Sequence, residues 1–457
     1  MGARSRSAAM QTERHDMGRL GIETRSSLSM HLSQYGDLPG IDQRRGKEPG
    51  SLIVEVEKSG LRGRGGGWFP TFRKLAAVVD SSSNMGRFDR SRHPVVIANA
   101  MEGEPASAKD AVLLASSPHL VFDGITAAAA TIGATDAFLA LHRGSKLLPI
   151  LTKALDERQA ARLDPLRISL VTPPARYVAS EESALSHWVG DGVATPVYPD
   201  RPFQKGAAGR PTLVNNAETM AHLGLIARYG GDWFAEVGVP SAPGTTLVTV
   251  GGCVSDPGVV EVPTGTTVRE ILAMCGGTTD TVRGYLTGGY GGGWVPAAGF
   301  EDTPWDPDGT RAAGAVIGAS VLFLVGESVC PLEEMARVVA WMAGESAGQC
   351  GPCVYGLPSI SDDFHHLAMR HISDDEMQHM KVRLSLIQGR GGCKHPDGTA
   401  RFIATGLSAF ADEVALHLDR RCSLAITRQV VRPGNPGLLP VPTPRLALVD
   451  VDGRDFE

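Results

Sequence analysis

Residues 59–74 read SGLRGRGGGWFPTFRK, and five of the eight residues from Gly60 to Gly67 are glycine. Glycine has no Cβ, so a backbone of this kind can bring its N–H groups close to an anion. Arg62 and Arg64 stand between the glycines and add positive charge. The stretch predicts a loop that binds the phosphate of a nucleotide, although a flexible turn would also be rich in glycine.

Three cysteines far downstream indicate a second functional centre. Cys350 and Cys353 form a Cys-x-x-Cys pair, and Cys393 follows two glycines. Each stands near an expected helix end, where chain segments can converge, and thiolate sulfur suits an iron–sulfur cluster. A Cys-x-x-Cys pair taken alone also serves as a redox dithiol or as two zinc ligands. A nucleotide loop together with a cluster site predicts electron transfer.

Composition narrows the class of protein. A chain of 457 residues is long enough for roughly two to four domains. Its 44 basic and 50 acidic residues leave a net charge of −6, so nothing indicates a nucleic acid or an anionic membrane as partner. The longest apolar stretch, residues 312–325, is shorter than the roughly 18 residues of a membrane span. It predicts a buried strand.

The N-terminus and the cysteine count indicate the compartment. Residues 1–27 are polar and lack the apolar core of a secretory signal, which predicts a disordered extension on a cytoplasmic protein. The seven cysteines are an odd number and include a Cys-x-x-Cys pair, which favours metal or redox chemistry over a disulfide framework.

The order of predicted elements divides the chain. Strands expected at 94–98, 137–141 and 167–171 alternate with helices, including 109–116 and 120–132, which predicts an α/β, Rossmann-like domain. A hairpin and a short helix at 268–275 resemble a small β-grasp module, and the chain from 332 to 418 reads as almost wholly helical. The expected divisions are an N-terminal extension, an α/β domain, a β-grasp domain, a helical domain and a tail, at residues 1–49, 50–239, 245–300, 328–420 and 421–457.

Residues 345–353, ESAGQCGPC, resemble the Glu-Ser-Cys-Gly-x-Cys-x-Pro-Cys motif of the flavin-carrying, NADH-oxidising subunit of respiratory complex I. Related subunits occur in NAD-linked hydrogenases and formate dehydrogenases. In that family the three motif cysteines and one farther on hold a [4Fe–4S] cluster. The resemblance implies that Cys350, Cys353 and Cys393 are cluster ligands, with Ala347 in place of the first cysteine.

The sequence leaves several candidates for the remaining ligand of the cluster. Water, hydroxide, His395 or, less favourably, Cys330 would complete a four-iron cluster, whereas a three-iron cluster needs only three ligands. A solvent-exposed, polar His395 is the simpler interpretation. If the cluster has been lost, the thiols pack as small hydrophobic groups.

Other motifs of the same family extend the resemblance over residues 50–415, through a flavin domain, an SLBB-type β-grasp domain and a helical cluster domain. In the family these motifs wrap FMN and the incoming nicotinamide nucleotide. The positions that match, and to which cofactor binding is therefore carried over, are Gly63, Arg64, Gly65, Gly66, Phe69, Lys74, Asn99, Glu102, Glu104, Tyr177, Glu181, Glu182, Phe203, Asn215 and Asn216.

Simpler structural roles stand beside these assignments. Glu102 and Glu104 would face solvent if they did not belong to a polar site. Glu181 and Glu182 would fit a helix N-terminus rich in glutamate, and the Asn215–Asn216 pair would fit a helix cap.

The resemblance implies an NADH dehydrogenase-like subunit that passes electrons from NADH through FMN to a cluster, and on to another redox subunit or a ferredoxin-like acceptor. Glu104 and Glu182 are the expected catalytic positions, and with Phe203 they would position NADH. The protein would be cytoplasmic or peripheral to a membrane-bound complex.

Substitutions at family positions support an alternative, a non-catalytic electron-relay or assembly subunit of the same fold. Bulky rings at two glycine positions would narrow or block the dinucleotide cleft. The departures are Trp68, Phe72, Met101, Ser180, Asp200 and Ala347. A third possibility keeps the flavin and the cluster but uses a different donor or acceptor.

Overall fold

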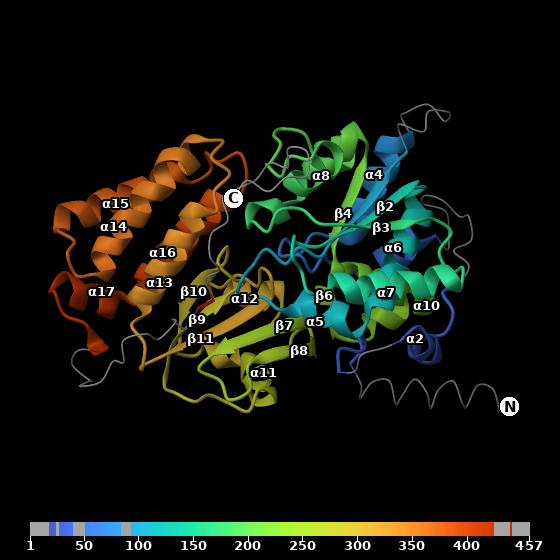
Figure 1. The fold of residues 1–457 in the computed structure, drawn as a ribbon. Coiled ribbons are helices and arrows are strands. Elements are labelled where there is room, and N and C mark those ends of the chain that lie inside the picture. Colours follow the sequence, from blue (N-terminus) through green and yellow to red (C-terminus); the bar gives the residue numbers. More distant parts are fainter. Residues whose placement is uncertain (1–17, 24–26, 40–50, 84–92, 425–438, 441–457) are drawn as a thin grey trace.

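The computed structural model describes residues 18–23, 27–39, 51–83, 93–424 and 439–440 (Figure 1). They form an α/β unit, a sheet unit and a helical unit. In Figure 1 the helical unit and the α/β unit stand on opposite sides, with the strands of the sheet unit below and between them. This arrangement agrees with the expected fold class.

The α/β unit is built on a parallel sheet of strand order β3-β2-β1-β4. Its strands are β1 (Val95–Asn99), β2 (Asp136–Ala140), β3 (Ile168–Val171) and β4 (Thr212–Asn216). β1 pairs with both β2 and β4, so Asn99 and Asn216 end side by side at the same edge. That edge, at the carboxyl ends of parallel strands, is where α/β sheets bind ligands.

Helices cover this sheet. They are α3 (Leu52–Ser59), α4 (Thr71–Ser83), α5 (Lys109–Ser116), α6 (Pro118–Ile132), α7 (Leu148–Ala160), α8 (Glu182–Asp191), α9 (Pro202–Lys205) and α10 (Ala217–Ala235). The predicted strands and helices of this unit are confirmed within a few residues at their ends. The parallel strands are apolar along their length because helices pack on the sheet.

The N-terminal segment contradicts the expectation of disorder where it is described. Leu20 is fully buried in the core of the α/β unit, and the guanidinium of Arg19 lies 4.0 Å from the ring centre of Trp233. α2 (Leu28–Tyr35) contributes His31, whose Nε2 lies 2.7 Å from Asp123. Leu20 and the stacked Arg19 therefore anchor this otherwise polar segment to the α/β unit. Residues 1–17 lie outside the described part.

The sheet unit has strand order β10-β9-β11-β7-β8. Its elements are β7 (Thr245–Gly252), β8 (Gly258–Pro263), α11 (Val268–Met274), β9 (Val282–Thr287), β10 (Gly293–Pro296), α12 (Pro307–Ala312) and β11 (Val321–Gly326). The expected hairpin of β7 and β8 and the helix α11 are present. The central strand β11 lies beyond residue 300, so this unit extends to Gly326. Of the apolar stretch 312–325, only the part from Val321 is a strand.

The helical unit begins at α13 (Pro331–Gly344). A short π-helix at Pro352–Gly356 precedes α14 (Leu357–Ala368), α15 (Asp374–Ile387), α16 (His395–Ala409) and α17 (Ala411–Leu418). Most of the expected tail lies outside the described residues, but Leu439 is buried in this unit, and the Tyr290 hydroxyl donates to the Pro440 carbonyl.

Among the described residues, no one helix has the length and apolar character to cross a membrane; only α5 and α6 taken together, bent by 96°, meet those two criteria.

We expect Gly124→Ala to destabilise the α/β unit by about 2–3 kcal/mol, because overpacking a tight core forces the backbone to shift. A Cβ on Gly124 of α6 would lie 1.7 Å from the Met220 carbonyl oxygen of α10. Thermal unfolding measures the effect. Gly344→Ala is the matched control, since a Cβ at this helical glycine meets nothing within 4 Å. Equal midpoints for the two variants would contradict the close approach of α6 and α10.

Candidate functional site

A cavity of about 580 Å³ lies between the α/β unit and the helical unit. Ten of the expected site residues line it: Gly63, Gly65, Phe69, Lys74, Asn99, Tyr177, Glu181, Glu182, Asn215 and Asn216. Cys393 lines it from the opposite side, together with His395 and Arg401. The expected nucleotide loop and one expected cluster ligand therefore border the same space.

The glycine loop is closed by backbone hydrogen bonds. Gly63 N–H donates to the Phe69 carbonyl at 2.8 Å, and Thr71 N–H donates to the Leu61 carbonyl at 3.0 Å. Within this loop the Phe69 ring is 53% exposed at the cavity. A ring held there by the backbone can stack on a flat ligand.

The bulky rings of the loop do not fill the cavity. Trp68 has a φ of 47°, a left-handed conformation that suits the glycine found at this position in the family. Its indole is 5% exposed, packs in the core of the sheet unit and donates to the Gly318 carbonyl at 3.1 Å. Phe72 packs against the core of the α/β unit. Phe72 does not line the cavity, but Trp68 does, so the narrowing of the cleft by Trp68 stays a prediction.

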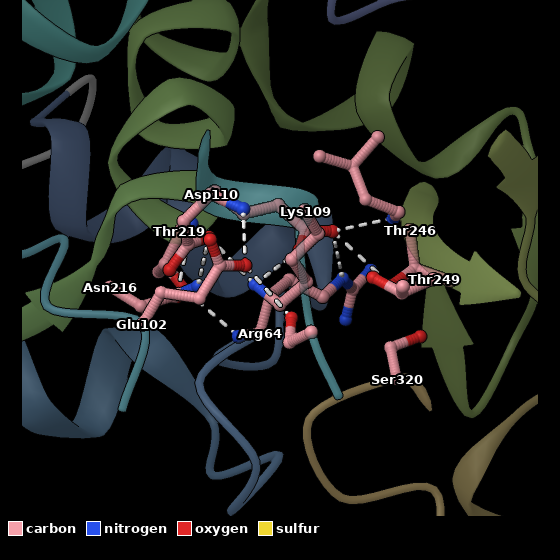
Figure 2. Close-up of polar contacts among 12 residues, drawn as sticks. Arg64, Glu102, Lys109, Asp110, Asn216, Thr219, Thr246, Thr249 and Ser320 are labelled. Carbon is pink, nitrogen blue, oxygen red and sulfur yellow. Dashed lines mark hydrogen bonds and ion pairs between the residues drawn. The ribbon is translucent and has the colours of Figure 1, made fainter. Parts of the chain in front are cut away.

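Arg64 occupies a different place from the one expected. Its guanidinium is buried and donates to the carbonyls of Pro243 and Thr245 at 2.9–3.2 Å. It lies 4.0 Å from Glu218 and 4.3 Å from the ring centre of Trp68. Arg64 thus joins the glycine loop to the sheet unit instead of reaching the cavity (Figure 2).

The ends of β4 and α4 supply polar groups to the cavity. Lys74 Nζ donates to the Val214 carbonyl at 2.5 Å and lies 3.0 Å from Glu182 Oε2. The amide Nδ2 of Asn215 is buried and has no hydrogen-bond partner among the described residues. A buried donor of this kind at a cavity wall is available to hydrogen-bond a ligand or a water molecule. Backbone N–H groups, a lysine and a free amide fit the phosphate and polar edges of FMN.

Two residues that were expected to contact the cofactor, Asn216 and Glu181, cap helices. Asn216 is the N-cap of α10 and accepts from Thr219 N–H at 3.2 Å. Glu181 is the N-cap of α8 and accepts from the N–H groups of Ser183 and Ala184 at 2.9 and 3.0 Å. These caps direct the N-termini of both helices toward the cavity, where their dipoles favour an anion.

A second cavity of about 290 Å³ adjoins the first and shares residues with it, among them Gly65, Asn99 and Tyr177. Gly66, Glu102 and Glu104 line this second space. Glu102 caps α5 by accepting from Asp110 and Ala111 N–H, each at 2.9 Å.

Glu104 is a buried carboxyl group of the second cavity whose pKa is strongly perturbed. It is buried and accepts from the N–H groups of Ala106 and Tyr290 at 3.1 and 2.8 Å. Burial raises the pKa of Glu104 to about 7, against the lowering effect of these hydrogen bonds. A carboxyl group with a pKa near neutrality can exchange a proton at physiological pH.

The three expected cluster cysteines come together at the edge of the helical unit. Burial raises the pKa of Cys353 to about 12, and the neighbouring Cys350 and Cys393 raise it as well. The Ala347 N–H donates to the Cys353 sulfur and lowers the same pKa. Three converging cysteines whose thiolate forms would repel one another fit a cationic iron–sulfur core.

His395 is buried, so its interpretation as a solvent-exposed side chain is wrong. Its Nε2 lies 2.8 Å from the Met342 carbonyl and therefore carries a proton, while Nδ1 has no partner among the described residues. Burial lowers the pKa of His395 to about 4. The Nδ1 atom of His395 therefore has a free lone pair, and His395 lines the main cavity. Cys330, the other candidate for the fourth ligand, lies instead with Glu413, His417 and Cys422.

The cluster motif is anchored to the α/β unit by Glu345. Its carboxylate accepts from Arg176 Nε at 3.0 Å and from Tyr177 N–H at 2.7 Å, and it is buried. The Tyr177 ring lies 5.5 Å from the rings of Trp341 and His395. This contact fixes the spacing between the nucleotide loop and the cysteines.

Three further positions at which the family binds its cofactors, Phe203, Met101 and Asp200, line neither of the two cavities described above. Phe203 packs against the core of the α/β unit, and Met101 is buried in a separate apolar cluster behind the sheet edge. Asp200 pairs with Lys205 at 3.0 Å.

Sequence reasoning missed a buried ion cluster behind the glycine loop. Lys109 Nζ lies 2.8 Å from Asp110 Oδ1 (Figure 2) and 3.0 Å from Glu218 Oε2. All three side chains are buried. A charged pair at the start of the apolar helix α5 was the only local signal, because Glu218 lies far along the chain.

Three known families match consecutive parts of the chain. Residues 56–224 match the Nuo51 FMN-binding domain, residues 247–289 the SLBB domain, and residues 333–417 the NADH-ubiquinone oxidoreductase-F iron-sulfur binding region. These matches follow the order of the three structural units.

The chain is similar to curated bacterial proteins described as the F subunit of NADH-quinone oxidoreductase. The F subunit of NADH-quinone oxidoreductase from Streptomyces coelicolor is 32% identical over 84% of this chain and 86% of its own length. The Mycobacterium bovis protein of that name is 30% identical, over 81% and 85%, and the Escherichia coli protein 27% identical, over 84% and 88%. The crystal structure of an NAD+-reducing [NiFe]-hydrogenase in the H2-reduced state is similar over 86% of this chain and 67% of that chain, with a TM-score of 0.75 and 25% identity.

The raised pKa of Glu104 predicts a pH dependence of stability. Between the ordinary value of 4.5 and about 7, the folded state binds more protons than the unfolded state. The free energy of unfolding therefore falls, through the titration of Glu104, as pH rises from 4.5 to about 7. Above about 7, Glu104 causes no further change. Glu104→Gln should remove about 3 kcal/mol of this fall, at 1.36 kcal/mol per pKa unit.

Thermal midpoints of the native protein and the variant, measured from pH 5 to pH 8, check this. Glu57→Gln, at an exposed position on α3, is the control and should reproduce the native profile. Native and Glu104→Gln profiles that run parallel across the whole range would show that Glu104 is not the titrating group.

Proposed function

The chain belongs to the family of NADH-quinone oxidoreductase F subunits, and we propose that it oxidises NADH with bound FMN and delivers the electrons to an iron–sulfur cluster. The observation that carries this proposal is that Cys393 lines the same cavity as the glycine loop. Flavin and cluster would then be direct neighbours. Hydride transfer and single-electron release are the chemistry that FMN supplies when bound.

We assign FMN binding to the glycine loop and the sheet edge behind it. Lys74 offers positive charge, Asn215 offers a free amide, and the N-termini of α8 and α10 point to the same space. Gly63, Gly65 and Gly66 let the backbone approach the ligand. Asn99 donates to the Ser180 carbonyl at 2.8 Å and so holds the floor of the cavity in place.

We assign NADH positioning to the residues at the open side of the main cavity and in its neighbour. Phe69 presents a half-exposed ring, and Glu182, 36% exposed, pairs with Lys74. Glu104 lies in the adjoining space with a pKa near neutrality and can hold or release a proton there. Tyr177 and His395 form part of the cavity wall beside Cys393.

The cluster would be held by Cys350, Cys353 and Cys393, with Ala347 supplying a backbone N–H in place of a thiolate. The free Nδ1 of His395 is our candidate for the remaining ligand. Homologous subunits belong to multi-subunit redox complexes by name, and we infer a redox subunit or a ferredoxin-like protein as the electron acceptor.

Anaerobic addition of NADH to the purified protein should bleach the flavin absorbance. Glu182→Gln should slow this bleaching about tenfold, because loss of a charged partner worth about 1.4 kcal/mol disturbs Lys74 in the cavity. Stopped-flow absorbance measures both, with Glu57→Gln as the control. Flavin that stays oxidised in the native protein would favour the non-catalytic relay instead.

Cys353→Ser should abolish the iron content and the broad iron–sulfur absorbance and leave FMN bound, because the flavin loop belongs to another unit. Iron and flavin quantified per chain test this. Cys275→Ser, at a buried cysteine of the sheet unit, should keep both. Unchanged iron in Cys353→Ser would refute the ligand assignment.

A further inference from the structure

Four buried side chains form a second group of metal-ligand type, outside the site described above. Cys330 precedes α13, Glu413 and His417 are one helical turn apart on α17, and Cys422 follows that helix. Their exposed fractions are 0–3%, and one ligand atom from each lies within 4.8 Å of all the others. We propose that these four residues bind a structural Zn²⁺, distinct from the iron–sulfur centre.

The spacing of the ligand atoms fits a tetrahedral site. Cys330 Sγ lies 3.5 Å from His417 Nε2 and 4.0 Å from Glu413 Oε1, and these last two atoms lie 3.3 Å apart. Zinc ligands stand about 2.0–2.3 Å from the metal, so their mutual separations in a tetrahedron are about 3.3–3.8 Å. Only small side-chain movements separate this arrangement from a closed site.

Neighbouring groups orient two of the ligands. His417 Nδ1 lies 3.0 Å from the Leu367 carbonyl, which can only accept, so Nδ1 carries the proton and the lone pair of Nε2 faces the cysteines. Both terminal nitrogens of Arg283 lie 3.0 Å from Glu413 Oε2, which leaves Oε1 toward the group. Supporting hydrogen bonds of this kind are typical of metal-bound histidine and carboxylate.

Charge favours a divalent cation at this position. Both thiols and the Glu413 carboxylate are buried, where negative charge without a positive partner is unfavourable. Two thiolates and the Glu413 carboxylate would bring three negative charges, of which a divalent cation offsets two; Arg283, shared between Glu413 and Asp412, offsets part of the third. Thiolate and imidazole ligands select zinc over calcium or magnesium.

The site has four protein ligands and no solvent-facing position, which is typical of structural zinc. It would fasten α17 and the segment after it to the start of α13, next to Arg283 on β9. The role is therefore to hold the end of the helical unit against the sheet unit.

Zinc and iron per chain, measured by inductively coupled plasma mass spectrometry on the full-length protein purified without an affinity tag, test the proposal. The native protein should hold about one zinc. Cys422→Ser should lose the zinc and keep the iron, Cys353→Ser should lose the iron and keep the zinc, and Cys275→Ser should keep both. Loss of zinc should also lower the thermal midpoint of Cys422→Ser by several degrees.

Cobalt replacement keeps the test informative if Cys422→Ser does not fold. Native protein produced with Co²⁺ should show the visible d–d bands of a tetrahedral thiolate site, and His417→Gln should shift them. A native protein that contains no zinc and takes up neither zinc nor cobalt would overturn the proposal. So would a folded Cys422→Ser with full zinc content, or a disulfide between Cys330 and Cys422 in non-reducing peptide mass analysis.

Discussion

The buried carboxylate of Glu218 is the interaction on which the arrangement of the site depends. It accepts from the Leu247 N–H of β7 at 2.9 Å and pairs with Lys109 at 3.0 Å. Burial alone would raise its pKa, but the charge of Lys109 and the nearby His222, 3.8 Å away, lower the pKa of Glu218 to about 2. Separating the sheet unit from the α/β unit would take away the hydrogen bonds that Thr246 and Leu247 donate to this buried carboxylate, which is unfavourable.

The same cluster determines where the glycine loop lies. Because Arg64 is committed to Pro243, Thr245 and Glu218, the loop backbone between Gly63 and Gly67 is held over the sheet edge (Figure 2). Glu345 performs the corresponding task on the other side by holding the cysteine motif to Arg176 and Tyr177. The cavity between them is a boundary between units, a common position for cofactor sites.

The sequence was a good guide to the local elements and a partial guide to the site. Apolar β-branched runs predicted β1 and β2, and helical periodicity predicted α5, α6 and α13. Lys74 and Asn215 line the main cavity with the glycine loop. Arg64 lies outside the cavity, and Cys330 lies apart from the other cluster cysteines, because their partners are distant in sequence: Arg64 bonds to a carbonyl 181 residues away, and Cys330 to a histidine 87 residues away. No local sequence pattern indicates which partner a buried charged side chain contacts.

The indole of Trp68 reaches Gly318, 250 residues later in the chain, to complete the conformation of the glycine loop. During synthesis this loop emerges from the ribosome early, while the strand β11 that follows Gly318 emerges much later. Contacts of such long range form only after the intervening chain is available. The glycine loop therefore gains its full set of contacts only after most of the chain has been translated, and a nascent chain truncated before Gly318 would lack the carbonyl that holds the Trp68 indole.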